Sequence, residues 1–196
     1  MTIPPDFTYP ERKVDTARLA AQVIAALAAD HRGAVQAGGC IGLWPMALAA
    51  HFDRVVTCEP APGNFAALTA NIAGVPAITA HACALGAEDG TTGLSRPKPN
   101  AGLWRLDGTG DIPVRRIDDL VGDQPIDALV LDVEGSEVLA LRGAERTIAQ
   151  THPLIWVECT QHAAAITAWL TAHGYPRLLH GLGGDCYSVH ASRVAH

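Results

Sequence analysis

The sequence predicts an α/β fold built on a doubly wound, mostly parallel sheet of seven strands that ends in an antiparallel hairpin. Short apolar runs alternate with longer segments in which apolar residues recur at helical spacing, the pattern of β and α units that form a parallel sheet. A glycine-rich turn joins the first apolar run to a helix, and two strand-like runs separated by glycines close the chain. These three observations define the expected fold class.

The expected elements follow this alternation. Strands are expected at 34–37, 54–58, 77–83, 112–116, 126–131, 154–157, 175–180 and 186–190. Helices are expected from a cap at Asp15 or Thr16 to about residue 29, after the glycine turn with Pro45 in the first turn, and at 62–73, 136–149 and 163–173. The segment 86–110 is rich in glycine and proline, and we expect it to form a short β excursion and loop over the carboxyl edge of the sheet.

The length of 196 residues suits one domain with a substantial core. Pro4, Pro5 and Pro10 favour an extended start to the chain. We therefore expect an N-terminal arm at 1–14 and a single domain at 15–196.

The charge of the chain argues against an extended nucleic-acid surface. The net charge is −6, and Lys13 and Lys98 are the only lysines. Arg105, Arg115 and Arg116 form the nearest basic group. Such groups are usually solvated surface charge, and contact with an acidic substrate is the alternative.

The cysteines and the apolar runs indicate the cellular compartment in which the protein is expected. The five cysteines are scattered along the chain, which predicts reduced thiols and no disulfide framework. The N-terminal segment lacks the layout of a signal peptide, and the longest apolar run, 19–29, is too short to span a bilayer. We expect a cytoplasmic protein with no membrane partner, and the sequence predicts no oligomeric state.

The glycine turn has the composition of a nucleoside-binding loop. Gly38, Gly39 and Gly42 remove Cβ atoms where a ligand can approach the backbone at the start of a helix. Glu59 ends the next strand, where a carboxylate can accept hydrogen bonds from both ribose hydroxyls of an adenosine ligand. The alternative is that these glycines serve only tight packing between helix and strand.

The spacing of the glycines separates two classes of ligand. A dinucleotide fingerprint that starts at Gly38 requires glycine where Cys40 and Leu43 stand. This argues against an oxidoreductase on a dinucleotide fold. The remaining spacing leaves room for a compact ligand with a cationic sulfur and no pyrophosphate, as in a methyltransferase.

Several longer motifs resemble the FkbM family of methyltransferases over about 34–158. They are VQAGGCIGLWP, TCEPAPGNFAALTANI, VRRIDDL, IDALVLDVEGSEVLALRGAERTI and IWVEC. The resemblance implies a Rossmann-like fold of the class I methyltransferase type, S-adenosylmethionine as cofactor, and methylation of hydroxyl groups on sugars, glycans or small natural products. The cofactor-binding residues assigned with it are Gln36, Gly38, Gly39, Cys40, Gly42, Glu59, Pro60, Asn64 and Ala84.

Two residues depart from the family's usual loop. Gln36 stands where the family has aspartate, and Cys40 where it has asparagine. A glutamine can hydrogen-bond the amine of the methionine moiety but brings no charge. The alternative function is therefore a methyltransferase-like module that binds a nucleoside with weak catalysis or none.

Acidic residues gather where two expected strands end. Asp132 and Glu134 follow the strand at 126–131, and Glu158 follows the strand at 154–157. We assign these three as catalytic, because a carboxylate there can orient or deprotonate an acceptor hydroxyl, and Glu137 as support for the turn. Asp132 could instead cap the turn, and a divalent metal such as magnesium held by the three carboxylates is a further alternative.

Three residues are candidates for substrate binding. Trp104 could stack on a sugar or base or anchor a loop, and Asp118 could contact substrate or cap a turn. His162 is a second candidate base or a surface residue. The expected partner is a small-molecule or glycan acceptor.

Overall fold

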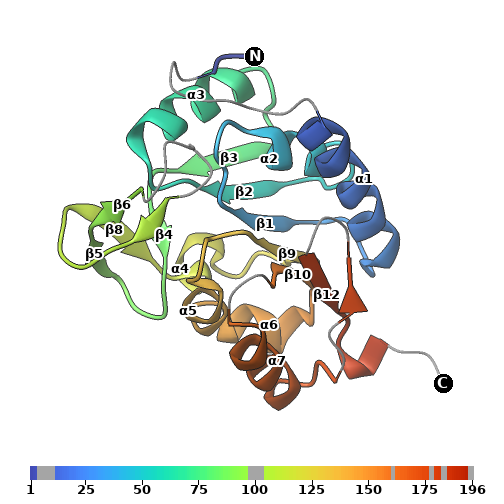
Figure 1. Ribbon diagram of the computed structural model, residues 1–196. Coiled ribbons are helices and arrows are strands. Elements are labelled where there is room, and N and C mark those ends of the chain that lie inside the picture. The colour runs from blue at the N-terminus through green and yellow to red at the C-terminus, as the bar shows by residue number, and fades with distance from the viewer. Residues whose placement is uncertain (4–11, 97–103, 160–161, 177–178, 182–184, 194–196) are drawn as a thin grey trace.

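The structure is a computed structural model that describes residues 1–3, 12–96, 104–159, 162–176, 179–181 and 185–193 (Figure 1). The helices are α1 (Arg12–Leu27), α2 (Leu43–Leu48), α3 (Pro62–Ile72), α4 (Ile117–Val121), α5 (Glu137–Arg142), α6 (Glu145–Thr151), α7 (Ala163–Ala172) and the 3-10 helix Ala191–Arg193. The strands are β1 (Ala34–Ala37), β2 (Val55–Cys58), β3 (Ile78–His81), β4 (Ala84–Leu85), β5 (Gly90–Thr92), β6 (Leu94–Ser95), β7 (Arg105–Leu106), β8 (Ile112–Arg115), β9 (Ala128–Leu131), β10 (Leu154–Glu158), β11 (Leu179–His180) and β12 (Asp185–Ser188).

The main sheet has seven strands in the order β11-β12-β10-β9-β1-β2-β3. Strands β3, β2, β1, β9 and β10 pair in parallel, whereas β12 pairs antiparallel with both β10 and β11. The predicted fold class, a doubly wound sheet with a terminal antiparallel hairpin, is therefore confirmed. The residues between β11 and β12, 182–184, lie outside the described part of the chain.

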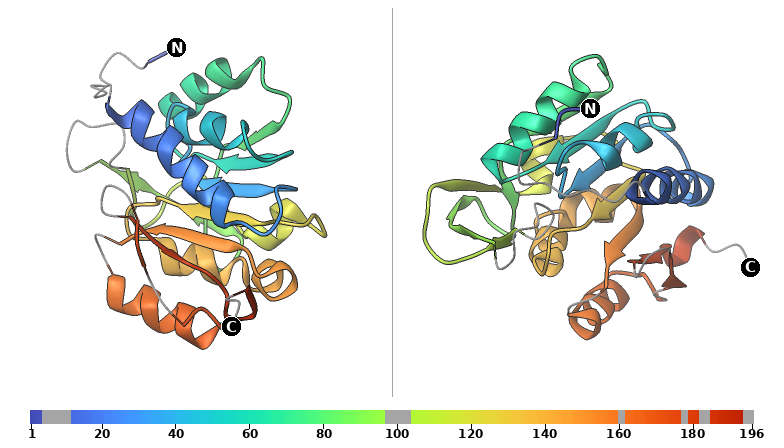
Figure 2. Two further views of the ribbon diagram at one scale, coloured as in Figure 1. Left: turned by 90° about the vertical axis from the view of Figure 1, so that its right-hand side faces the viewer. Right: turned by 45° about the horizontal axis from the view of Figure 1, so that its top comes forward.

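Helices cover both faces of the main sheet (Figures 1 and 2). Alternate residues of β9 face opposite sides of the sheet. Ala128 and Val130 pack in the core shared with α1, α2 and α3, and Leu129 and Leu131 pack in the core shared with α4 to α7. All four residues are fully buried. A strand covered on both faces is apolar at every position, which explains its unbroken apolar sequence.

Two smaller sheets extend from the main one. Strands β4, β8 and β5 form one of them, and the short β6 and β7 form the other. The strand expected at 112–116 is thus present as β8, but outside the main sheet. The β excursion expected within 86–110 is present in β5, β6 and β7, whereas 97–103 lie outside the described residues.

Two helix expectations need correction. The helix expected at 136–149 is two helices, α5 and α6, because the chain bends at Gly143, where the carbonyl oxygen of Gly86 occupies the place of a Cβ. Helix α1 begins at Arg12, so Asp15 lies in its first turn and is not its cap. The helix therefore includes 12–14, which were expected in the arm, and 4–11 lie outside the described residues.

Within the described part of the chain, none of the helices has both the length and the apolar character needed to cross a bilayer.

Candidate active site

The strand order of the main sheet reverses between β1 and β9. The chain passes from β1 to β2 and β3 on one side and returns to β9 on the other. In open α/β sheets, ligands bind in the crevice at the carboxyl ends of the strands on either side of such a reversal. Gly38 follows β1 and Asp132 follows β9, so both lie at this crevice.

The loop after β1 requires glycine for two separate reasons. Gly38 has a φ of 82° and Gly42 a φ of 101°, both in the left-handed region. In addition, a Cβ on Gly38 would clash with the carbonyl oxygen of Asp132. The glycine loop and the carboxylate edge therefore pack directly against each other.

Glu59 is a buried carboxylate that holds this loop. Its Oε2 accepts a hydrogen bond from the Cys40 backbone N–H at 2.7 Å, and its Oε1 accepts one from the Ala61 N–H at 2.9 Å. The Asn64 amide also donates to Oε1, at 3.4 Å. Burial raises the pKa of Glu59, although these three donors oppose the shift. An ionised carboxylate offers about four acceptor positions, so acceptor capacity remains for ribose hydroxyls.

Gln36 is fully buried, and its amide is used within the protein. Its Nε2 donates to the carbonyl oxygens of Ala37 and Gly38 at 2.9 and 3.0 Å, and its Oε1 accepts from the Thr57 hydroxyl at 2.6 Å. Gln36 therefore fixes the backbone at the start of the loop. Any contact with the amine of a methionine moiety, which donates hydrogen bonds, would use the Gln36 Oε1, which already accepts from Thr57.

The other residues assigned to the cofactor site are spread around the loop. Cys40 has a φ of 49°, unusual for a residue with a Cβ, and Asn64 lies in α3 with its amide toward Glu59 and the Cys40 sulfur. Pro60 is half-buried directly after Glu59. Ala84 is buried in β4, where it pairs with Val114.

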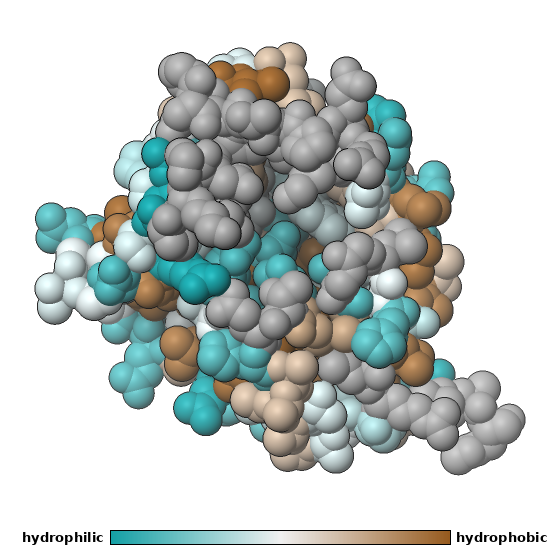
Figure 3. All heavy atoms as spheres, in the orientation of Figure 1, coloured by the Kyte–Doolittle hydropathy of each residue, from teal (hydrophilic) through white to brown (hydrophobic). Residues whose placement is uncertain are grey.

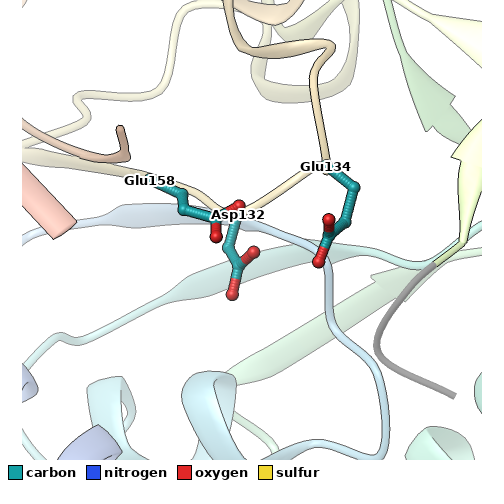
Figure 4. A group of neighbouring side chains, drawn as sticks. All are labelled: Asp132, Glu134 and Glu158. Atoms are coloured by element: carbon teal, nitrogen blue, oxygen red, sulfur yellow. The ribbon is translucent and has the colours of Figure 1, made fainter. Parts of the chain in front are cut away.

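Asp132, Glu134 and Glu158 form a compact cluster of carboxylates (Figure 4). One carboxylate oxygen from each lies within 4.8 Å of the others, and all three residues are half-buried. The structure therefore brings together the three residues that were assigned as catalytic. Hard oxygen donors at this spacing also have the ligand chemistry of a magnesium or calcium site.

The turn that carries Glu134 has unusual backbone geometry. Glu134 has a φ of 52°, and Gly135 a φ of 109°. The Gly135 N–H donates to Oε1 of the buried Glu137 at 2.9 Å, which agrees with the supporting role expected for Glu137. The turn therefore directs Glu134 back toward Asp132 and Glu158.

The structure places Asp118 inside the protein, away from this cluster. Its side chain is buried, and its Oδ1 accepts from the backbone N–H and hydroxyl of Thr147 at 2.9 and 2.8 Å. Its Oδ2 accepts from the Arg146 N–H and the Arg116 guanidinium at 3.1 and 3.0 Å. This geometry gives Asp118 a structural role at the start of α6, and its contact with a substrate stays a prediction.

The two other substrate candidates lie at the surface. His162 is exposed in a left-handed conformation before α7 and is not part of the carboxylate cluster. Trp104 is half-buried, and the guanidinium carbon of Arg96 lies 5.2 Å from the centre of its ring. Arg96 and Thr57 have no local sequence signal, because the contact of each is with a residue distant in sequence, Trp104 and Gln36 respectively.

Comparison with known proteins identifies the family. Residues 36–176, most of the chain, match the methyltransferase FkbM domain. The chain belongs to the FkbM methyltransferase family. A solved FkbM methyltransferase from Methylobacillus flagellatus KT is 25% identical, with a TM-score of 0.60 over 82% of this chain. The chain spans 44% of that protein's length.

Other methyltransferases share the fold of this FkbM domain at lower identity. Precorrin-6y C5,15-methyltransferase from Geobacter metallireducens GS-15 is 12% identical, with a TM-score of 0.56 over 96% of each chain. A protein of the methyltransferase class from Streptococcus mutans, solved in complex with SAH, is 8% identical, with a TM-score of 0.55 over 87% of this chain and 93% of its own. A search among curated proteins found no match.

Proposed function

We propose that this chain is an S-adenosylmethionine-dependent methyltransferase that methylates a hydroxyl oxygen of a sugar, glycan or small natural product. One observation carries the proposal: the glycine loop after β1 lies directly against the carboxylate edge after β9, because Gly38 abuts the Asp132 carbonyl. Cofactor and acceptor would thus meet in one crevice. Membership of the FkbM family supports the same conclusion.

The residues present fit the proposed cofactor. The left-handed glycines Gly38 and Gly42 leave the loop backbone open to close approach, and Glu59 offers an acceptor to ribose hydroxyls at the end of β2. When bound, S-adenosylmethionine supplies a methyl group on a sulfonium that is already activated as a leaving group. The protein's main task is therefore to position the acceptor.

The carboxylate cluster would prepare the acceptor oxygen. An ionised carboxylate only accepts hydrogen bonds, so Asp132, Glu134 and Glu158 can orient a hydroxyl by its proton. One of these carboxylates would take the hydroxyl proton while the acceptor oxygen gains the methyl group and the carbon–sulfur bond to the leaving thioether breaks. Because the Asp132 backbone abuts the loop at Gly38, Asp132 would face the methyl group, with Glu134 or Glu158 as the base.

Magnesium held by the same three carboxylates would lower the pKa of the acceptor hydroxyl. The two roles are separated by titrating magnesium into the protein loaded with S-adenosylhomocysteine. If the carboxylates act as a base, the heat of magnesium binding should be the same in the wild-type protein and in Asp132→Asn. If the wild-type protein binds magnesium and Asp132→Asn does not, the carboxylates hold a metal instead.

Isothermal titration with S-adenosylmethionine tests the proposal. We expect saturable binding to the folded protein. The Glu59→Gln variant should bind roughly tenfold to a hundredfold more weakly, because a charge-assisted hydrogen bond to ribose is lost. A folded protein that gives no heat and no thermal shift at millimolar cofactor would refute both the enzyme and the alternative nucleoside-binding module.

Methyl transfer separates the enzyme from that module. Incubation with methyl-labelled S-adenosylmethionine and a small-molecule extract should yield a labelled product. We expect Asp132→Asn to reduce the yield while cofactor affinity changes little. Binding without transfer to any acceptor would favour the module.

A further inference from the structure

Basic side chains concentrate in one segment of an acidic chain. Residues 96–116 contain five of the 14 lysines and arginines, in a protein with a net charge of −6. They are Arg96, Lys98, Arg105, Arg115 and Arg116. This segment includes β7 and β8 and follows directly after β6.

Two of these arginines are already neutralised. Arg115 pairs with Asp89 at 3.0 Å, and Arg116 pairs with Asp118 at 3.0 Å. Arg105 differs, because it is exposed and has no ion-pair partner among the residues that the structure describes. A cation left without a carboxylate in an acidic protein remains available to an anionic ligand.

Arg96 and Trp104 lie next to Arg105 on a small β ladder. Strands β6 and β7 pair antiparallel, with Ser95 opposite Arg105. Arg96 follows β6 and Trp104 precedes β7, and the guanidinium carbon of Arg96 lies 5.2 Å from the centre of the Trp104 ring. This cation–π contact holds an aromatic surface and a positive charge together. We call Arg96, Trp104 and Arg105 the basic ladder.

The basic ladder lies on the same side of the molecule as the proposed active site. In Figures 1 and 2, β4 and β6 lie beside the carboxyl ends of β2 and β3, the edge at which the site opens. In the space-filling view, hydrophilic residues gather on this face of the molecule (Figure 3). The positive ladder and the negative carboxylate cluster are thus separate features of one edge.

We infer that the acceptor carries an anionic group, a phosphate or a carboxylate, which the basic ladder binds while the hydroxyl to be methylated lies at the carboxylate cluster. This inference rests on the proposed methyltransferase function. Three carboxylates repel an anion at the cluster itself, so the negative group of such an acceptor is directed away from it. Guanidinium groups bind carboxylate and phosphate through paired hydrogen bonds, and Trp104 offers a surface on which a sugar ring can stack.

Three matched probes test this inference on the protein loaded with S-adenosylhomocysteine. They are glucose, glucuronate and glucose 6-phosphate, which share a ring and differ in charge. We expect the two anionic probes to bind at least about tenfold more tightly than glucose at low, fixed ionic strength. The double variant Arg96→Gln/Arg105→Gln should reduce this preference to about twofold or less.

A matched control is Arg18→Gln, which removes an exposed arginine from α1, at the opposite side of the molecule in Figure 1. The control should keep the full preference for anions. Equal binding of the three probes, no binding of any of them, or a preference that survives in the double variant would overturn the inference. Binding of S-adenosylhomocysteine, measured first, shows separately whether the cofactor site itself has failed.

Discussion

Cys40 has the least ordinary backbone geometry in the cofactor loop. Its φ of 49° lies in the left-handed region, which asparagine and glycine adopt at lower cost than cysteine. We expect Cys40→Asn to raise the free energy of unfolding by about 1 kcal/mol, measured by denaturant titration. The control Cys40→Ala removes the thiol without adding a polar side chain that favours the left-handed region, so it should give no such gain. Equal stability of the two variants would contradict this account of the loop.

If Glu59 binds the ribose as proposed, cofactor binding should depend on pH. Burial raises its pKa above the ordinary 4.5, so in the folded protein the carboxylate takes up a proton at a higher pH than an exposed glutamate does. Ribose hydroxyls donate stronger hydrogen bonds to the ionised carboxylate than to the protonated one. We therefore expect affinity for S-adenosylmethionine to fall as the pH decreases from about 8 toward about 5.

The neutral variant Glu59→Gln is the control for this pH dependence. Its weaker binding should change little over the same range, because the titrating group is gone. A parallel decline in both proteins, measured by calorimetry at fixed ionic strength, would assign the pH dependence to another group.

Sequence reasoning at the residue scale succeeded where chemistry depends on position along one strand. Asp132, Glu134 and Glu158 follow strand ends and do converge. The hydrogen-bond partners of Gln36 and Asp118 could not be predicted, because Thr57 and Thr147 are 21 and 29 residues away in the sequence. A side chain whose hydrogen-bond partners lie on another strand or helix has no local signature in the sequence.

At the scale of elements, the break between α5 and α6 depends on one close backbone approach. The carbonyl oxygen of Gly86, directly after β4, occupies the space of a Cβ on Gly143. We expect Gly143→Ala to lower the free energy of unfolding by about 1–3 kcal/mol, because the smaller sheet must move.

Gly63 in α3 provides the matched control, since nothing lies within 4 Å of a Cβ built there. Gly63→Ala should be neutral or stabilise by up to about 1 kcal/mol, because alanine favours helix. If thermal or chemical unfolding showed Gly143→Ala to be as stable as Gly63→Ala, the close approach would not explain the break. Helical periodicity continues across Gly143, so the sequence alone predicts one helix.

At the scale of the whole molecule, the topology of the main sheet follows from the alternation of strands and helices. It was the most predictable feature of the structure. Five parallel strands and the final hairpin appear as expected, because a β-α-β alternation strongly limits the possible topologies. The exception is β8, which pairs with β4 and β5. A short run has the same local pattern in either sheet, so only tertiary pairing decides its place.

The same topology produces the site, because the strand reversal between β1 and β9 places the glycine loop against the carboxylate edge. A crystal structure with S-adenosylhomocysteine would show whether the ligand binds at this junction. We expect ribose hydroxyls within hydrogen-bonding distance of Glu59, and a sulfur that faces Asp132, Glu134 and Glu158. A ligand bound elsewhere, for example in the open pocket lined by Phe65, Ile72 and Val75, or a ribose turned away from Glu59, would contradict it.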